Sequence, residues 1–252
     1  MSAGALNTDL LQIDDELTDE ERLIRDTVRA FARDRVLPHV EDWFEEGTLP
    51  RDIMPELGKL GVLGMHLAGY GCAGAGAIAY GVACRELEAC DSGLRSAASV
   101  QGSLSMYPIW RYGSEEQKNE WLPRMAAGEA VGCFGLTEPD HGSDPGSMRT
   151  FARKDGSDWV LSGTKMWITN GSIADIAVVW AGTEEGIRGF LVPRGTQGAP
   201  DDAVAGLVET RQRPLEPAHV RKDRRAGQLD LIEHELAGHR RTQRHLVLDL
   251  RR

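Results

Sequence analysis

The sequence has few cysteines, and their spacing excludes the common roles of clustered cysteine. The four are Cys72, Cys84, Cys90 and Cys133. None forms a C-x-x-C pair, and none stands with histidine at the spacing of a zinc site. We therefore expect free or buried thiols in a reducing compartment, and we expect no metal.

Positive charge and long apolar runs are also scarce. The formal net charge at pH 7 is −10 over 252 residues. A nucleic-acid-binding surface needs an excess of lysine and arginine, so we expect no nucleic-acid partner. No apolar stretch reaches the length of a membrane span, and residues 1–21 show no basic region followed by an apolar run. We expect no membrane partner, no signal peptide and a cytoplasmic location.

Aromatic residues are missing from the end of the chain. Six tryptophans, four tyrosines and five phenylalanines all precede residue 199, whereas four of the seven histidines follow it. The segment 199–252 is rich in arginine and has no cysteine or methionine. Such a segment buries too little apolar surface to offset its ordering entropy, so we predict a poorly ordered tail. Translation in a shifted reading frame would produce the same abrupt change, and we keep that as a hypothesis.

Ahead of this tail, helical patterns give way to strand patterns. Thr18 and Glu21 have the spacing of a capping box, and apolar residues then follow one helical face until Pro38, which should end the helix. Further helices are predicted within residues 50–128. "FARKDGSDWVLSGTKMWIT" predicts a hairpin, and "IADIAVVWAG" and "GIRGFLVP" predict more strands. This order favours an α+β fold with segregated units over a doubly wound sheet.

One glycine pattern matches a nucleotide-binding fingerprint. "GYGCAG", residues 69–74, fits G-x-G-x-x-G, which binds a dinucleotide when it lies between a strand and a helix. The preceding "GVLGMHLA" is a poor strand. A flexible turn is the favoured interpretation, with a nicotinamide-binding protein as the alternative.

The most unusual stretch is "GCFGLTEPDHGSDPGS", residues 132–147. It gathers glycines and small hydroxyl residues around Glu138 and Asp144. Nothing nearby gives the two carboxylates the different environments that acid-base catalysis needs, and His141 with its acidic neighbours matches no standard metal-ligand spacing. Glycine and hydroxyl residues let a backbone approach a ligand and donate hydrogen bonds to it. We predict a ligand cradle, with a structural turn as the alternative.

"MWITNG", residues 166–171, follows the predicted hairpin. A Trp-Ile-Thr sequence on a strand beside the cradle could place an aromatic face against a flat cofactor ring, and an ordinary β core is the alternative. Taken together, "CFGLTEPDHGSD" and "LSGTKMWITNG" resemble the acyl-CoA dehydrogenase flavoprotein family. "EACDSGLRSAASVQGSLSMYPIWRYGSEEQKNEWLPRMAAGE" resembles its glutaryl-CoA dehydrogenase branch. The resemblance covers residues 18–198.

The resemblance implies an all-α N-terminal domain, expected over residues 1–131, and part of a β-barrel middle domain over residues 132–198. We expect the segment 199–252 to be unlike the family and the family's C-terminal helical bundle to be missing. The implied cofactor is FAD, the implied substrate is an acyl-CoA, and the implied redox partner is an electron-transfer flavoprotein. Family tetramers assemble largely through the missing bundle, so the homo-oligomer expected of the family is not predicted for this chain.

The resemblance also implies roles for individual residues. The cofactor-binding residues would be Phe134, Leu136, Thr137, Gly142, Ser143, Trp167, Ile168 and Thr169. The substrate-binding residues would be Arg95, Ser96, Ser99 and Ser143. An arginine at position 95 makes physical sense, because its fork matches the free carboxylate at the end of a dicarboxylic acyl chain. Glu138 and Asp144 would then be structural or cap backbone amides.

The implied reaction is the α,β-dehydrogenation of glutaryl-CoA with decarboxylation to crotonyl-CoA. The family's general base is a glutamate in the C-terminal helical domain, so no catalytic base is carried over to this sequence. Glu233 and Glu235 lie in surroundings that do not match. The sequence therefore predicts a truncated and impaired flavin-dependent acyl-CoA dehydrogenase of the glutaryl-CoA type. A non-catalytic remnant or interaction protein of the same fold is the alternative.

Overall fold

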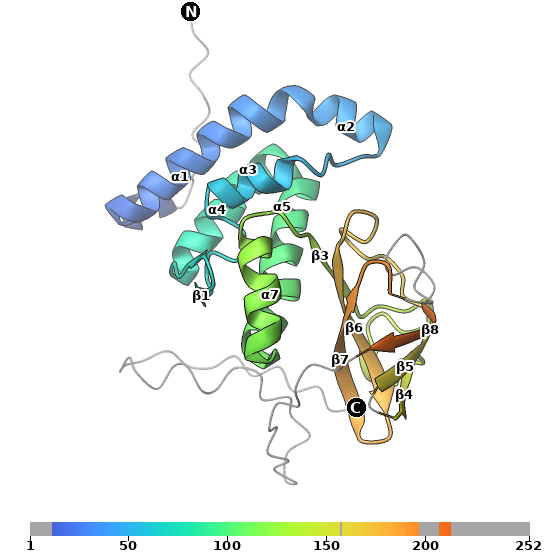
Figure 1. Cartoon of the computed structure of the whole chain (residues 1–252). Helices are drawn as coiled ribbons and strands as arrows, with labels where there is room; N and C mark the ends of the chain where they lie inside the picture. The colour runs from blue at the N-terminus through green and yellow to red at the C-terminus, as the bar shows by residue number, and fades with distance from the viewer. Residues whose placement is uncertain (1–11, 157, 197–206, 213–252) are drawn as a thin grey trace, which may run out of the picture. The chain divides into compact units, whose positions relative to one another are not determined.

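The structure is a computed structural model that describes residues 12–156, 158–196 and 207–212, the last of these for the backbone alone. Helices come first along the chain and the main sheet follows, which confirms the predicted α+β order (Figure 1). The α-helices are α1 (Asp19–Phe31), α2 (Val40–Glu46), α3 (Ile53–Lys59), α4 (Ala77–Cys90), α5 (Ser92–Ser99), α6 (Tyr107–Tyr112) and α7 (Glu115–Ala126). The strands are β1 (Ala68–Gly69), β2 (Cys72–Ala73), β3 (Gly132–Gly135), β4 (Phe151–Asp155), β5 (Asp158–Gly163), β6 (Ile176–Thr183), β7 (Gly186–Pro193) and β8 (Leu207–Gln212). Short 3-10 turns span Ile13–Glu16, Leu37–His39 and Pro145–Ser147, and π-helical segments span Ala32–Val36 and Val100–Met106.

Helix α1 begins where the sequence predicts. Thr18 Oγ1 accepts a hydrogen bond from the Glu21 N–H at 3.3 Å, and Glu21 Oε2 accepts one from the Thr18 N–H at 2.8 Å. This capping box satisfies donors that a helix start leaves free. The predicted end at Pro38 is wrong, because the chain continues through a π-helical and a 3-10 turn and enters α2 at Val40. Pro38 lies in the first turn of the 3-10 segment, where its missing N–H has no helical partner to lose.

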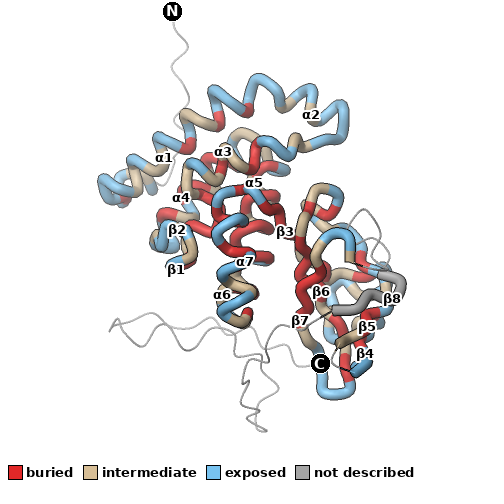
Figure 2. Tube along the Cα trace, in the orientation of Figure 1, coloured by how far each residue is buried: buried red, intermediate tan, exposed pale blue. Residues whose placement is uncertain are grey.

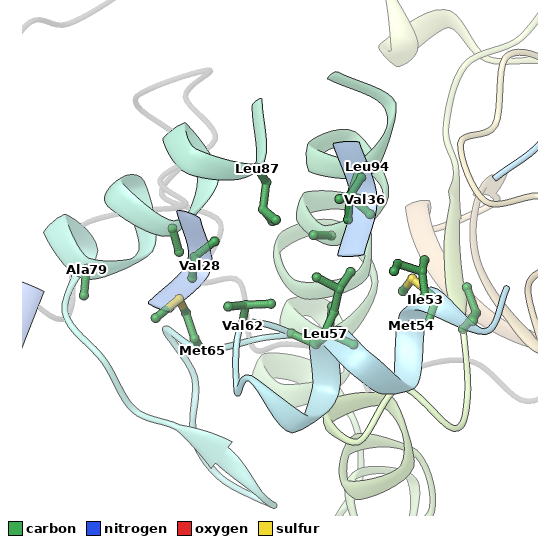
Figure 3. Packing of buried hydrophobic residues seen from close by; sticks show 14 residues of the cluster. Val28, Val36, Ile53, Met54, Leu57, Val62, Met65, Ala79, Leu87 and Leu94 are labelled. Atoms are coloured by element: carbon green, nitrogen blue, oxygen red, sulfur yellow. The ribbon is translucent and has the colours of Figure 1, made fainter. Parts of the chain in front are cut away.

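The helical unit surrounds one apolar cluster (Figure 3). Val28 and Val36 lie in it with Leu57 of α3, Leu87 of α4 and Leu94 of α5, and each is at most 2% exposed. Along the chain trace, buried residues recur through α3, α4 and α5, whereas α2 is largely exposed (Figure 2). Full burial of one such side chain contributes about 1.5–3 kcal/mol. The cluster therefore fixes α4 and α5, the helices on either side of the chain reversal before Arg95.

Two glycines let α3 pack very closely against the end of α7. A Cβ atom at Gly58 would lie 2.2 Å from the Ala127 carbonyl oxygen, and one at Gly128 would lie 2.1 Å from the Met54 carbonyl oxygen. Gly128 also has a left-handed φ of 73°, which a residue with a side chain rarely adopts. These contacts fix the point at which the chain leaves α7 and enters β3.

The central strand of the main sheet is β6. It pairs in parallel with β3, at one position with β4, and antiparallel with β7 along its whole length, while β5 joins β4 to β8. Ile176 and Val178 pack into a cluster with residues of α6 and α7, and Ala177 and Val179 pack into a second cluster with Phe190 of β7. Both faces of β6 are therefore buried, which explains its unbroken apolar run. The two predicted strands in this region are confirmed.

The predicted hairpin forms from β4 and β5, and Gly156 in its turn has a φ of 63°. Strand β8 pairs antiparallel with β5. It is a strand that the sequence analysis did not predict, and it lies inside the segment 199–252. The other predictions for that segment, including Glu233 and Glu235, lie outside the described residues. In the part of the chain that the structure describes, no helix is both long and apolar enough to cross a bilayer.

The glycine-rich stretch 69–74 forms a tight two-stranded turn. Strands β1 and β2 pair antiparallel, and Gly69, Tyr70 and Gly71 all have left-handed φ angles, of 79°, 54° and 83°. The helix that follows, α4, leads into α5 and not into a parallel strand. This arrangement is not the βαβ unit of a dinucleotide fold, so the predicted turn is confirmed.

Candidate functional site

The two sequence motifs that the resemblance paired lie against each other in space. The Met166 N–H donates to the Thr137 carbonyl oxygen at 2.9 Å. Lys165 Nζ donates to the Leu136 carbonyl oxygen at 3.0 Å. The stretch after β3, which the sequence analysis predicts to be a ligand cradle, therefore lies against the turn after β5, and we call the two together the cradle. We call residues 164–171 the Trp167 turn.

A buried ion pair joins the two sides of the cradle. Lys165 Nζ lies 2.9 Å from Glu138 Oε1, and the two side chains are 0% and 4% exposed. Glu138 also accepts hydrogen bonds from the backbone N–H groups of Arg149 at 2.6 Å and Thr150 at 2.9 Å. The prediction that Glu138 caps backbone amides is therefore confirmed. These contacts give Glu138 a structural role, because its oxygens bind protein donors from three residues.

The charge state of this pair follows from its contacts. Burial alone would raise the pKa of Glu138, but hydrogen bonds from Thr150, Lys165 and the Arg149 amide outweigh burial and lower that pKa to about 2. Burial lowers the pKa of Lys165, and the Glu138 carboxylate opposes that change. Glu138 is therefore ionised at neutral pH, and its buried carboxylate pairs with Lys165 between the two sides of the cradle.

The Trp167 turn is not the strand that the sequence predicted. Strand β5 ends at Gly163, where a Cβ atom would lie 2.4 Å from Thr150 Oγ1. Trp167 and Asn170 then adopt left-handed φ angles of 60° and 65°. Asparagine tolerates that conformation, but a bulky residue such as tryptophan rarely does. Trp167 is also 85% exposed, so the turn holds an indole ring away from the protein's own core.

The other predicted cofactor residues differ in how far they are buried. Phe134 is half-buried and contacts Trp180 edge to face, with ring centroids 5.9 Å apart. Leu136, Thr137 and Ile168 are half-buried, whereas Gly142, Ser143 and Thr169 are exposed. A Cβ atom at Gly142 would meet no atom within 4 Å. The eight residues thus lie on β3, in the stretch that follows it and in the Trp167 turn, and Ser143 and Thr169 are exposed there.

The predicted substrate residues lie on α5. Arg95 Nε donates to Glu88 Oε2 of α4 at 2.5 Å, and Arg95 Nη1 donates to Ser99 Oγ at 3.2 Å. Ser99 Oγ donates to the Ser96 carbonyl oxygen at 3.1 Å. The Arg95 side chain is 35% exposed, and Glu88, beside it, has a pKa lowered by its hydrogen bonds to Arg95 and Ser92. Arg95 is therefore oriented by neighbours and still open to solvent.

The sequence analysis missed the row of residues that faces Arg95. Tyr80, Cys84 and Glu88 recur every four residues along one face of α4, which is the signal that could have found them. The Tyr80 hydroxyl and Ser103 Oγ are 2.8 Å apart, and Glu88 pairs with Arg95, so the α4 row runs antiparallel to the row on α5 and the following π-helical segment. His66 packs on the Tyr80 ring with centroids 4.6 Å apart.

Two amide side chains, also missed, connect α5 and its continuation to the cradle. Gln101, fully buried, accepts a hydrogen bond from the Gly132 N–H at 2.7 Å and donates to the Ala130 carbonyl oxygen at 2.8 Å. Asn170 Nδ2 donates to the carbonyl oxygens of Ala97 and Gly132, both at 3.2 Å. The partners are backbone atoms far away in the sequence, so no local pattern points to them.

Comparison with known families gives two adjacent matches. The model of the acyl-CoA dehydrogenase N-terminal domain matches residues 18–129, and that of the acyl-CoA dehydrogenase middle domain matches residues 133–215. Together they cover more than half of the chain. The middle-domain match extends past residue 198, where the sequence analysis ended the resemblance, and includes β8.

Individual relatives agree with these matches. The chain is 38% identical over 192 residues to the short-chain specific acyl-CoA dehydrogenase of Bos taurus, covering 73% of this chain and 46% of that protein. A crystal structure of a glutaryl-CoA dehydrogenase from Mycobacterium smegmatis in complex with FADH2 aligns with a TM-score of 0.79 and 58% identity, over 83% of this chain and 58% of that one. A structure described as the electron transferring flavoprotein of Acidaminococcus fermentans aligns with a TM-score of 0.72 and 31% identity, over 79% and 57%. The chain spans about half the length of the curated relatives it matches.

Proposed function

Because the chain belongs to the acyl-CoA dehydrogenase family, whose members are flavin-dependent oxidoreductases, we propose that it carries the flavin-facing and acyl-end parts of a glutaryl-CoA dehydrogenase. The proposed reaction is the α,β-dehydrogenation of glutaryl-CoA with decarboxylation to crotonyl-CoA. FAD, when bound, would accept the hydride that leaves the β carbon of the substrate. An electron-transfer flavoprotein is the proposed redox partner.

The observation that carries the cofactor proposal is the exposed, left-handed Trp167. An 85% exposed indole in a conformation that tryptophan rarely adopts adds little to the packing of the residues that the structure describes. Beside a flat ring system it would supply a large apolar contact face. The cradle fits an isoalloxazine ring, because Thr137, Ser143 and Thr169 add hydroxyl groups and Gly142 leaves open space. Phe134, Leu136 and Ile168 would line the floor.

The observation that carries the substrate proposal is the position of Arg95. Its guanidinium has five N–H donors, and Glu88 and Ser99 accept from Nε and Nη1. The remaining donors can bind the terminal carboxylate of a dicarboxylic acyl chain, because a carboxylate and an arginine match in charge and in planar geometry. A monocarboxylic acyl chain such as butyryl would have no group for them. Ser96 and Ser99 would assist Arg95, and Ser143 would contact the CoA side.

The residues of the described part hold and orient ligands, and we assign none of them as the general base. Glu138 is excluded because Lys165 and two backbone amides occupy its oxygens. Glu88 is excluded because it binds Arg95 and Ser92, at the acyl end and not at the thioester. The proposed contribution of this region to the reaction is therefore binding and positioning.

An absorbance spectrum tests the proposal directly. The full chain is mixed with FAD, the excess is removed, and retained flavin bands are expected. Trp167→Ala should retain less flavin, and Phe44→Ala, a change in an 82% exposed aromatic residue of α2, is the matched control. Glutaryl-CoA should then perturb the flavin bands at lower concentration than butyryl-CoA. A soluble, folded chain that retains no flavin would contradict the proposal.

A further inference from the structure

The Asn170 side chain lies between α5 and β3 and binds both. Its Nδ2 donates to the Ala97 carbonyl oxygen and to the Gly132 carbonyl oxygen at 3.2 Å each. Both acceptors are carbonyl oxygens, so only the amide nitrogen can serve them, and this fixes which way the side chain points. Asn170 therefore uses both N–H bonds of one NH₂ group to join two separate elements.

The Ala97 contact reaches the helix that carries the acyl-end residues. Ala97 lies between Arg95 and Ser99 on α5, and its carbonyl oxygen also accepts from the Val100 N–H at the end of that helix. Ala97 is 1% exposed, so this carbonyl is not solvated and depends on protein donors. A shift of Asn170 would thus be transmitted to the helix backbone beside Arg95.

The Gly132 contact reaches the start of the cradle. Gly132 is the first residue of β3, and its N–H already donates to Gln101 Oε1 at 2.7 Å. A Cβ atom at Gly132 would lie 2.6 Å from the Ser105 Cβ, so the strand is packed tightly against the π-helical segment after α5. Asn170 and Gln101 together satisfy both backbone polar groups of Gly132.

The backbone of Asn170 shapes the Trp167 turn. Its φ of 65° reverses the chain, the Gly171 N–H donates to the Ile168 carbonyl oxygen at 3.0 Å, and the Ile173 N–H donates to the Asn170 carbonyl oxygen at 3.0 Å. Asparagine is one of the few residues that adopts this conformation readily and also carries a donor. The same residue therefore bends the turn and anchors it.

We propose that Asn170 is a positioning residue that joins the Trp167 turn to α5, so that the flavin-facing indole and the Arg95 guanidinium are held at one fixed separation. What the two ends bind rests on the proposed function, whereas the link itself does not. Fixing this separation would pre-organise the acyl chain between its terminal carboxylate and the flavin ring.

Hydrogen exchange of backbone amides in the full chain without FAD tests the link. Asn170→Asp keeps the size and the left-handed tendency but turns a carboxylate toward two carbonyl oxygens, and Asn170→Gly keeps the backbone conformation without any side chain. Both variants should exchange roughly tenfold faster in the Trp167 turn and also in α5, because two hydrogen bonds are lost. Ser172→Ala, an exposed change next to the same turn, is the control and should leave both regions unchanged. Faster exchange confined to the turn, with α5 unchanged in both variants, would overturn the proposal.

FAD binding gives an independent second readout. Both Asn170 variants should bind FAD roughly tenfold more weakly than the parent chain, since the indole is no longer held in place. Parent-like FAD affinity in both variants would overturn the positioning role. If the parent chain itself binds no FAD, the proposed function fails, and the exchange pattern alone then decides the link. If Asn170→Asp does not fold, Asn170→Gly decides both measurements.

Discussion

Two ion pairs lie at the candidate site, and they differ in almost every physical respect. Lys165 and Glu138 are 0% and 4% exposed, whereas Arg95 and Glu88 are 35% and 45% exposed. The first pair also binds backbone groups, since Lys165 donates to the Leu136 carbonyl oxygen and Glu138 accepts from the amides of Arg149 and Thr150. In the second pair, the Arg95 guanidinium has five N–H donors, and Glu88 and Ser99 accept from Nε and Nη1. The comparison separates a pair that builds the site from a pair that can exchange partners with a ligand.

The buried pair belongs to the framework because of what surrounds it. Lys165, in the turn after β5, pairs with Glu138 in the stretch after β3. Glu138 also accepts hydrogen bonds from the backbone amides of Arg149 and Thr150. A buried charge without its partner is costly, so each member requires the other. No ligand can displace either one without leaving the other unpaired.

The exposed pair has the opposite properties. Water screens the attraction between Arg95 and Glu88, so the pair contributes little to stability. The same screening lowers the free energy needed to separate Arg95 from Glu88. A substrate carboxylate that approaches Arg95 can therefore share or replace the Glu88 contact, which a buried pair would not allow.

The largest expected effect comes from breaking the buried pair. Glu138→Gln removes the charge opposite Lys165 and should lower the free energy of unfolding by about 3–5 kcal/mol, measured by urea denaturation at pH 7. Flavin retention should fall with it, because both sides of the cradle lose their junction. Asp144→Asn, which changes an exposed carboxylate of the same stretch, is the control and should leave stability nearly unchanged.

A double variant sharpens this result. Glu138→Gln combined with Lys165→Met removes the orphaned charge and should recover part of the stability that Glu138→Gln loses. If Glu138→Gln is as stable as the parent chain, the pair is not the framework element that its burial indicates.

The buried pair should also make the free energy of unfolding depend on pH in acid. The folded pKa of Glu138, about 2, lies below its ordinary value of 4.5. A depressed carboxyl pKa stabilises the fold above the ordinary pKa, and that stability is lost as the pH falls from about 5 toward 2. A shift of this size corresponds to about 3 kcal/mol. The gap in unfolding free energy between the parent chain and Glu138→Gln should therefore narrow from pH 7 to pH 3, and a gap that is independent of pH would contradict this assignment.

The sequence predicted one member of each pair and missed the other. Glu138 and Arg95 stand in recognisable motifs, whereas Lys165 in "SGTKMW" looks like an ordinary surface residue, since lysine is almost never fully buried. Glu88 was missed because its partner lies across a helix reversal. In both cases the motif shows the residue type, and only the fold shows its partner.

The backbone, too, was predicted correctly in one region and wrongly in another. The strand over β6 was predictable because burial on both faces leaves an unbroken apolar run. The Trp167 turn was wrongly predicted as a strand, because tryptophan rarely adopts the left-handed φ that Trp167 has, so its residue type does not mark the bend. Asn170 itself could not be predicted as an anchor, because its acceptors are backbone carbonyls at Ala97 and Gly132.

A change at the exposed pair should affect binding more than folding. Arg95→Gln should weaken glutaryl-CoA binding roughly 10- to 100-fold, the range expected for losing charge-assisted hydrogen bonds to a carboxylate. Butyryl-CoA binding should stay within about twofold, because that ligand has no terminal charge. Flavin difference spectra measure both affinities. Arg111→Gln, an exposed arginine on α6, is the matched control, and an equal loss for both ligands would mean that Arg95 acts on the fold and not on the acyl end.

The smallest expected effect is that of Glu88→Gln. The amide keeps an acceptor for Arg95 Nε and removes only the charge, so the urea midpoint should not change measurably, in contrast to Glu138→Gln. The pKa of Glu88 is lowered by Arg95 and Ser92, so the carboxylate is ionised throughout the neutral range and competes there for Arg95. Removing that competition should leave glutaryl-CoA affinity equal to or a few-fold above that of the parent chain. A loss of stability as large as that of Glu138→Gln would contradict the distinction between the two pairs. A loss of glutaryl-CoA affinity with stability unchanged would show that Glu88 orients Arg95 by its charge.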